Sequence, residues 1–161
     1  LDFLGITQPV LERVLEAKMV EKIKELILEL GYGFAFIGNQ YKISSPTKDY
    51  FIDLLFYHRK LKCLVAFELK AGEFKAEFAG KMNLYLNILD DFVREKDENP
   101  SIGIILCAEK ENFEVEYAIR GFSKPMGVAE YKLTKELPSE FKGTLPTPQE
   151  LKKELFQKQE K

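Results

Sequence analysis

The sequence has few of the residues that build zinc sites and disulfides. Its 161 residues contain one histidine and two cysteines. The single histidine, His58, excludes chemistry that requires two imidazoles, such as hydrolysis at an HExxH zinc site. Cys63 and Cys107 each lie within an apolar run and neither belongs to a CxxC pair, so a structural zinc site is not expected. We interpret both as buried free thiols of a protein in a reducing cytoplasm.

Long apolar segments are also missing. No run approaches the ~20 apolar residues of a membrane span, and no basic segment followed by an apolar stretch opens the chain. We therefore expect neither a membrane protein nor a secretory signal. With 45% hydrophobic and 31% charged residues, the composition is that of an ordinary globular domain. The net charge of −2 argues against a protein that coats nucleic acid by bulk electrostatics, although it leaves room for a local basic groove.

Hydrophobic periodicity predicts an α/β fold. We expect helices over residues 10–30, 75–95 and 112–120, and strands over residues 34–43, 50–57, 61–69, 102–107 and 127–133. Asn112 would cap the third helix, residues 58–60 would form a hairpin turn, residues 71–72 would end the third strand, and a short charged helix would lie near residues 148–157. This order favours a mixed central sheet flanked by helices, with a C-terminal extension.

Two acidic residues and a lysine stand at positions where charge is costly. Asp53 lies among apolar neighbours in the second strand, where an ionised carboxylate costs free energy unless it is paired. Glu68 and Lys70, two residues apart in the next strand, project from one face. The two carboxylates could share a divalent cation, for which oxygen ligands favour Mg²⁺ or Mn²⁺ over zinc. The alternatives are that Asp53 caps a turn at a strand end and that Glu68 and Lys70 form an ordinary ion pair.

Helical geometry adds a third acid. At ~100° per residue, Glu16 falls inside the arc of apolar residues of the first helix that should pack against the sheet. A carboxylate on that face needs a reason to be there. The alternative is that Glu16, close to the first turn, complements the helix dipole. The residues themselves favour neither interpretation.

These residues belong to a longer pattern. Asp53, a hairpin and then Glu68-Leu69-Lys70 resemble the signature of the PD-(D/E)XK nuclease superfamily, and the expected αβββαβ order resembles its restriction-endonuclease-like core. Three segments resemble the nuclease domain of YhcG-type proteins: DYFIDLLFYHRKLKCLVAFELKAGEFKAEFAGKMNLYLNILDD, NPSIGIILC and KPMGVAEYKLTKELP. The stretch ELGYGFAFIGNQY before them fits as well, so the resemblance covers most of the chain.

The resemblance implies metal-dependent cleavage of phosphodiester bonds, with Mg²⁺ or Mn²⁺ as the cofactor. Asp53, Glu68 and the backbone carbonyl of Leu69 would bind the metal ion, and Lys70 would be the catalytic lysine. Glu16 matches the acid that members carry on the first helix and would be a further catalytic and metal-binding residue.

The chain departs from the family pattern at two positions. Ile52 replaces the proline that gives the motif its first letter. In the helix after the motif, many relatives carry a glutamine four residues before a tyrosine, and here Lys81 stands at that distance from Tyr85. A lysine there could contact phosphate or the metal-bound acids, which leaves the role of this helix open.

Basic side chains offer a surface for a substrate. Lys75 and Lys81 near the start of the second helix, and Arg59 and Lys60 at the hairpin turn, could contact phosphates without reading sequence. Tyr85 could stack on a base. The alternatives are a solvated turn and helix face for the basic residues, and core packing for the tyrosine.

The sequence therefore predicts a Mg²⁺-dependent endonuclease acting on nucleic acid, DNA in the first place, in the cytoplasm. The alternative is a non-cleaving nucleic-acid-binding or protein-interaction module on a nuclease scaffold. We divide the chain into a nuclease-like domain at residues 1–137 and a tail at residues 138–161. YhcG-type proteins usually carry this domain at the C-terminal end of a longer polypeptide, so we expect an N-terminal partner domain, while a homodimer stays open.

Overall fold

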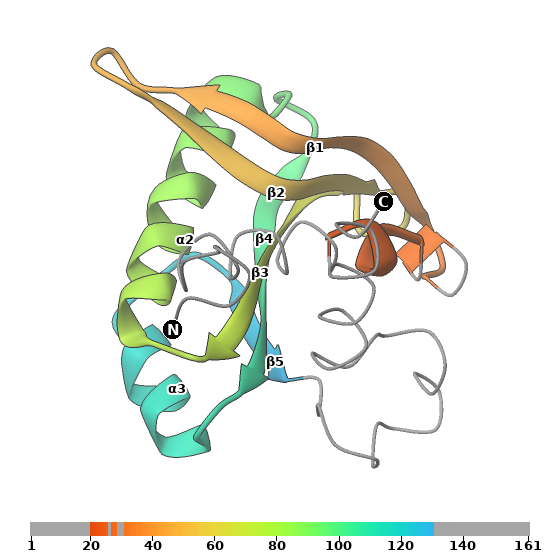
Figure 1. Ribbon diagram of the computed structural model, residues 1–161. Coiled ribbons are helices and arrows are strands. Elements are labelled where there is room, and N and C mark those ends of the chain that lie inside the picture. Colours follow the sequence, from red (N-terminus) through yellow and green to blue (C-terminus); the bar gives the residue numbers. More distant parts are fainter. Residues whose placement is uncertain (1–19, 26, 29–30, 131–161) are drawn as a thin grey trace, which may run out of the picture.

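The computed structural model describes residues 20–25, 27–28 and 31–130. In this part of the chain, five strands form one sheet in the order β1-β2-β3-β4-β5 (Figure 1). The strands are β1 (Phe34–Ser44), β2 (Asp49–His58), β3 (Cys63–Glu73), β4 (Asn99–Glu109) and β5 (Met126–Glu130). The helical elements are α2 (Ala76–Ile88), the π-helical turn η1 (Leu89–Val93) and α3 (Asn112–Ile119). Residues 20–25 and 27–28 are helical as well.

The sheet is mixed, as the sequence predicted. The pairs β1–β2 and β2–β3 are antiparallel, whereas β3–β4 and β4–β5 are parallel. Parallel neighbours need a crossover, and α2 and α3 supply the two connections. The order of helix, three strands, helix and strand is that of the restriction-endonuclease-like core. Among the described residues, no helix is long and apolar enough to cross a membrane.

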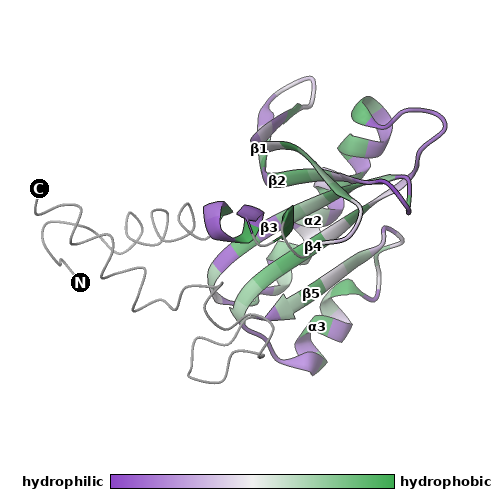
Figure 2. Ribbon diagram, turned by 90° about the vertical axis from the view of Figure 1, so that its right-hand side faces the viewer, coloured by the Kyte–Doolittle hydropathy of each residue, from purple (hydrophilic) through white to green (hydrophobic). Residues whose placement is uncertain are grey.

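Each face of the sheet has its own hydrophobic core. On one face, Val20 and Ile23 of the first helix pack against alternate residues of β2 and β3, including Phe56 and Leu69. On the other face, α2 and α3 cover the intervening residues of the same strands, so that the strands are apolar on both sides. Figure 2 shows the green of hydrophobic residues along the strands between these layers. The two cysteines are buried and free, which confirms that prediction.

Several boundaries differ from those expected. Strand β3 continues past residues 71–72 because Glu73 pairs with Glu109 of β4. Strand β4, expected from residue 102, already opens at Asn99, which pairs with Cys63 and whose backbone N–H bonds the Lys62 carbonyl at 2.8 Å. Strand β5 begins at Met126, and its expected end lies outside the described residues, as do the charged helix near residues 148–157 and the proposed boundary at residue 137.

Asn112 does not cap α3, so that prediction was wrong. The N-cap residue is Glu111, and the Asn112 side-chain oxygen accepts a hydrogen bond from Lys110 Nζ at 2.6 Å instead. A neighbouring charged donor has therefore taken the oxygen that a capping role would need.

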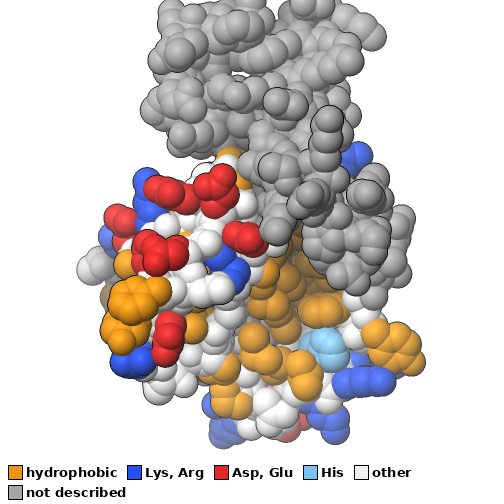
Figure 3. Space-filling model, turned by 90° about the horizontal axis from the view of Figure 1, so that it is seen from below, with side chains coloured by type: hydrophobic (Ala, Val, Ile, Leu, Met, Phe, Trp, Pro, Cys, Tyr) orange, Lys and Arg blue, Asp and Glu red, His pale blue; other side chains and the backbone are white. Residues whose placement is uncertain are grey.

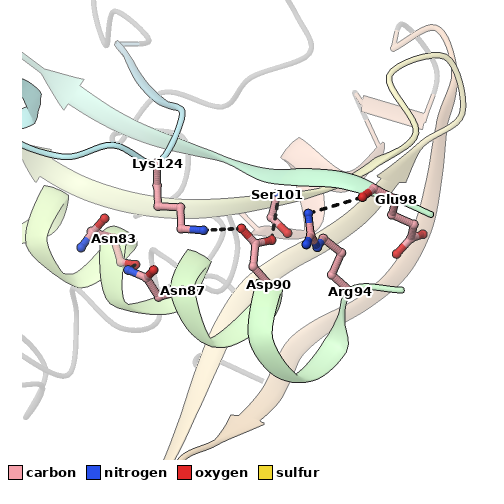
Figure 4. A network of polar contacts seen from close by, with 7 residues as sticks. All are labelled: Asn83, Asn87, Asp90, Arg94, Glu98, Ser101 and Lys124. Atoms are coloured by element: carbon pink, nitrogen blue, oxygen red, sulfur yellow. Dashed lines mark hydrogen bonds and ion pairs between the residues drawn. The ribbon is translucent and has the colours of Figure 1, made fainter. Parts of the chain in front are cut away.

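The second helix is shorter than expected because Asp90 is anchored to the sheet. Its carboxylate accepts a hydrogen bond from the Ser101 backbone N–H at 3.0 Å and one from Lys124 Nζ at 2.7 Å (Figure 4). The chain there winds as the π-helical turn η1, whose C-cap residue is Arg94. The Arg94 side chain donates a hydrogen bond to the Glu98 carbonyl at 3.4 Å. Burial alone would raise the pKa of Asp90, but the hydrogen bonds from Lys124 and Ser101 outweigh it and lower that pKa.

The β1–β2 hairpin extends beyond the rest of the sheet (Figure 1). Its ladder reaches Ser44 and Asp49, whereas the ladder between β2 and β3 ends at Leu54 and Phe67. Beyond that point, Ile43 and Ile52 turn to the core that contains α2. The end of the β2–β3 ladder is thus a fork, with the hairpin on one side and β3 on the other.

Candidate active site

Asp53 lies at the fork, where β2 leaves β3. Within β2, Leu54 and Ile52 both pair with β1, but Asp53 between them pairs with neither neighbouring strand. Its side chain replaces the missing ladder bonds. Asp53 Oδ2 accepts a hydrogen bond from the Leu69 backbone N–H of β3 at 2.8 Å, and Oδ1 accepts one from Gln40 Nε2 of β1 at 3.0 Å. The carboxylate is therefore held from both sides.

Glu68 lies opposite Asp53 at the same fork. Its Oε1 accepts a hydrogen bond from the Asp53 backbone N–H at 3.1 Å, and the residue is only 7% exposed. Burial raises the pKa of Glu68 to about 8, and the charge of Asp53 adds to that shift. The Asp53 hydrogen bond and the charges of Lys70 and Lys81 act in the opposite direction without cancelling it. The structure thus brings two carboxylates together in a place where burial and mutual repulsion outweigh the nearby positive charges.

Two predicted lysines accompany the acids. Lys70 follows Glu68 by two residues on β3, and its ammonium group lies 4.9 Å from the centroid of the Phe78 ring of α2. Lys81 follows Phe78 by about one turn of α2, and its ammonium group lies 5.7 Å from the centroid of the Tyr85 ring. Both charges act on Glu68 and lower its pKa. The helix after the motif therefore contributes a positive charge to the site.

Tyr85 lies in the core and not on a surface that could receive a base. It is 2% exposed and its ring contacts the Tyr50 ring edge-on, with centroids 5.9 Å apart. Burial and the nearby charges of Glu68 and Asp53 raise the pKa of its hydroxyl, so this group stays neutral beside the acids. Core packing, the alternative to base stacking for Tyr85, is the arrangement seen.

The remaining basic candidates lie at the start of α2 and in the turn after β2. Lys75 is the N-cap residue of α2 and is exposed. Arg59 and Lys60 lie in the turn after β2, six residues or more from Asp53 along the chain, which is roughly 20 Å in an extended strand. Lys60 Nζ stands 4.3 Å from the Tyr32 ring centroid. Arg59 and Lys60 could meet a long substrate, but they lie far along β2 from the groups at the fork.

His58 is part of the same distant turn. Its Nδ1 accepts a hydrogen bond from the Leu61 backbone N–H at 3.1 Å, and its ring meets the Phe34 ring edge-on with centroids 4.8 Å apart. Figure 3 shows the histidine, in pale blue, among hydrophobic side chains. This agrees with a structural role in the turn.

The donors at the fork fit a hard divalent cation. Asp53 and Glu68 offer carboxylate oxygens, and the carbonyl of Leu69, the residue after Glu68, is the predicted third ligand. The high pKa of Glu68 fits as well, because a bound cation would favour its ionised form. Glu16, the predicted fourth, lies outside the described residues. Within the residues that the structure describes, no three His, Cys, Asp or Glu side chains gather closely enough to hold a metal ion.

Gln40 is a site residue that the sequence reasoning missed. It contacts Asp53 directly, and its backbone has φ of 45°, which is rare for a residue with a side chain. The polar run Gly38-Asn39-Gln40 inside an otherwise aromatic strand is a signal of irregular backbone that could have drawn attention to it.

Known proteins resemble this chain in sequence. The model of the YhcG PDDEXK nuclease domain family matches residues 1–146. The Escherichia coli (strain K12) protein "Putative nuclease YhcG" is 39% identical over 140 residues, which cover 87% of this chain and 37% of that protein. The chain thus spans little more than a third of the length of that relative.

Two solved structures have a similar backbone. A repair endonuclease from Pyrococcus abyssi is similar over 68% of this chain and 46% of its own, with a TM-score of 0.49 and 16% identity. A complex of EndoMS with double-stranded DNA gives the same TM-score, 0.49, and the same 16% identity over 68% of this chain and 44% of its own.

The sheet, its helices and the paired acids define an α/β domain of the PD-(D/E)XK class. The family match, which covers most of the chain, then fixes the particular family. The chain belongs to the YhcG PDDEXK nuclease domain family.

Proposed function

We propose that this domain hydrolyses phosphodiester bonds in DNA as an endonuclease that depends on Mg²⁺, with Mn²⁺ as a substitute. The observation that carries the proposal is the fork. Two carboxylates from adjacent strands are held there, Glu68 by the Asp53 backbone N–H and Asp53 by the Leu69 backbone N–H. The positive charges of Lys70 and Lys81 both act on Glu68. Two such groups repel in a buried place, and a bound cation would relieve that repulsion.

Asp53, Glu68 and the Leu69 carbonyl would hold the cation, with Glu16 as the predicted further ligand. When bound, a divalent ion of this kind supplies a water of lowered pKa and polarises the scissile phosphate. Glu68 would be ionised in that state, because the cation offsets both its burial and the charge of Asp53.

Lys70 would act on the reacting groups from the same face as Glu68. Its ammonium group can orient the attacking water and offset the negative charge that grows on the phosphate. The position of its Nζ over the Phe78 ring, 4.9 Å from the centroid, limits the directions in which the ammonium group can point. Lys81, from α2, adds a second positive charge where many relatives place a neutral amide, and would contact a phosphate near the cut.

The substrate class is proposed from the family and from the charges around the fork. Lys75 at the start of α2, and Arg59 and Lys60 at the distant turn, would contact the backbone of a longer duplex without reading its sequence. Whether two copies act together to cut two strands stays a prediction, as does an N-terminal partner domain.

The decisive experiment compares cleavage by matched variants. Supercoiled plasmid, branched DNA, single-stranded DNA and RNA are incubated with the protein and Mg²⁺ or Mn²⁺. Asp53→Asn and Lys70→Met remove the charge of each group while keeping its size. Asp97→Asn and Lys96→Met make the same changes at exposed residues of the loop before β4.

We expect cleavage by the wild type and by both loop variants, and a loss of about 100-fold or more in the two site variants. Equal cleavage by all five proteins would contradict the assignment of these residues. Binding of DNA without cleavage by the wild type, under every metal condition, would favour the alternative of a non-cleaving module. Cleavage of RNA alone would change the substrate class.

A further inference from the structure

We propose that Gln40 is a positioning residue for Asp53, which holds the Asp53 carboxylate in the orientation that lets it share a divalent cation with Glu68. The inference rests on the proposed metal site. It adds a residue from β1, on the opposite side of β2 from Glu68.

The register places Gln40 directly opposite Asp53. Asn39 pairs with Leu54 and Tyr41 pairs with Ile52, so the two residues between them face each other. Neither takes part in the backbone ladder at that point. The interruption of the ladder is therefore local to this pair, and the side chains bridge it.

The backbone of Gln40 is held in an unfavourable conformation. Its φ of 45° lies in the left-handed region, where the Cβ of an L-residue crowds the following carbonyl oxygen. Residues held this way persist when surrounding contacts determine them, and they cluster at functional sites. The contact that Gln40 makes is the hydrogen bond from its Nε2 to Asp53 Oδ1, at 3.0 Å.

The two donors on Asp53 come from opposite sides. Gln40 bonds Oδ1 from β1, and the Leu69 backbone N–H bonds Oδ2 from β3. Together they fix the plane of the carboxylate. The amide nitrogen of Gln40 must face Asp53, because its oxygen would be repelled there. Partners that orient metal ligands in this manner commonly change metal affinity by about 10- to 100-fold when removed.

A purely structural role for Gln40 makes a different prediction. Its side chain is exposed, so it contributes little to either core. If the left-handed backbone were its only feature, glycine at this position would relieve the strain and leave metal binding unchanged. Lys62 provides a matched control, since it is also exposed and has φ of 53°, but it lies in the turn after β2, away from the fork.

The test uses the whole chain and measures the binding of Mn²⁺ alone by calorimetry, together with the melting temperature. Gln40→Gly removes the amide and the strain, Gln40→Met removes the amide and keeps the length, and Lys62→Gly removes strain together with a side chain that lies away from the fork. We expect both Gln40 variants to bind Mn²⁺ about tenfold more weakly than the wild type, and Lys62→Gly to bind it equally. The two glycine variants should show similar changes in melting temperature.

The outcomes separate this inference from the proposed function. If the wild type binds Mn²⁺ and both Gln40 variants bind it as tightly, the role of Gln40 is overturned while the metal site stands. If Gln40→Met alone keeps full affinity, the hydrogen bond is overturned as the cause. If the wild type fails to bind Mn²⁺ at millimolar concentration, the metal site and this inference fail together.

Discussion

Asp53 and Glu68 are bound to each other's strands across the fork. The Asp53 backbone N–H donates to the Glu68 carboxylate, and the Asp53 carboxylate accepts from the N–H of Leu69, the residue after Glu68. The two acids therefore replace ladder bonds as well as facing the proposed cation site. Alanine at either position would leave a backbone N–H without its partner, whereas the corresponding amide keeps an acceptor. Asp53→Asn and Glu68→Gln are therefore the substitutions that test the charge of each acid without removing its hydrogen bond.

Glu68→Gln should change how stability depends on pH. The pKa of Glu68 is raised from its usual 4.5 to about 8 in the folded protein. Between these values the folded state binds one proton more than the unfolded state. The contribution of Glu68 is therefore fully present below about pH 4.5 and is lost as the pH rises through 8. The glutamine of the variant does not titrate. The unfolding free energy of the variant should therefore rise relative to that of the wild type as the pH rises.

Urea denaturation in metal-free buffer at several pH values between 4.5 and 9 would measure this difference. Glu73→Gln, at an exposed position near the end of β3, is a suitable control. Parallel pH profiles for wild type and Glu68→Gln would contradict a Glu68 that is buried and protonated near neutral pH.

Lys81→Gln restores the neutral amide that many relatives carry and should weaken binding to DNA. If Lys81 neutralises one phosphate, the slope of log K against log salt for duplex DNA should fall in magnitude by about 0.9. Fluorescence anisotropy in Ca²⁺ or EDTA, at several salt concentrations, would measure it. Lys96→Gln, exposed in the loop before β4, should leave the slope unchanged. An unchanged slope for Lys81→Gln would restrict the role of Lys81 to the charge it places near Glu68.

Asp90→Asn should destabilise the protein by about 2 kcal/mol, because it weakens a hydrogen bond from a charged donor in a largely buried place. The Asp90 side chain is 5% exposed and that of Lys124 is 23% exposed. The pKa of Asp90 is lowered, so its contribution is present above its usual pKa and is lost as the pH falls below that range.

The ion pair between Arg120 and Glu116 is the natural comparison. It has a similar length, 2.9 Å, but its side chains are 60% and 63% exposed. Glu116→Gln should therefore cost less than about 0.5 kcal/mol. Equal losses for the two variants, measured by chemical denaturation, would mean that Asp90 does not anchor η1 to β4.

Gly103→Ala should destabilise the contact between β4 and α2. A methyl group on Gly103 would lie 2.6 Å from two side-chain atoms of Met82 and 3.1 Å from Leu86. Both side chains are fully buried, so a shift of either disturbs the core, and overpacking of this kind typically costs about 1–3 kcal/mol.

Gly127→Ala is the matched control, because nothing lies within 4 Å of the added group on β5. We expect its melting temperature to be unchanged or slightly raised. A further test is Met82→Ala combined with Gly103→Ala, which should lose less stability than the sum of the single losses. Strict additivity would show that the two residues do not share the space.

The sequence predicted most of the sheet and both acids from patterns that are local. The apolar runs of β2 and β3, and the helical spacing around Val20 and Ile23, follow from which side chains must leave water. Asp53 and Glu68 stood out because a charge is costly among apolar neighbours, and the family resemblance paired them with Lys70. These inferences depend on residues that lie close together in the chain.

The errors and omissions mostly involve residues that are far apart in sequence. The end of α2 depends on Asp90 reaching Ser101 and Lys124, and the length of β3 depends on Glu109. The burial of Tyr85 depends on the hairpin that carries Tyr50. A pattern within one element cannot report such contacts, because they form only when the elements pack.

The sequence by itself determined an α/β nuclease-family domain with Asp53, Glu68 and Lys70 as its candidate reactive groups. Only the tertiary structure decided that β2 leaves β3 at Asp53, that Glu68 is buried enough to hold its proton near neutral pH, and that Gln40 in a left-handed conformation bonds the Asp53 carboxylate. The physical reason is that composition and periodicity determine which residues are buried, whereas the orientation and pKa of a buried acid depend on the strands that surround it.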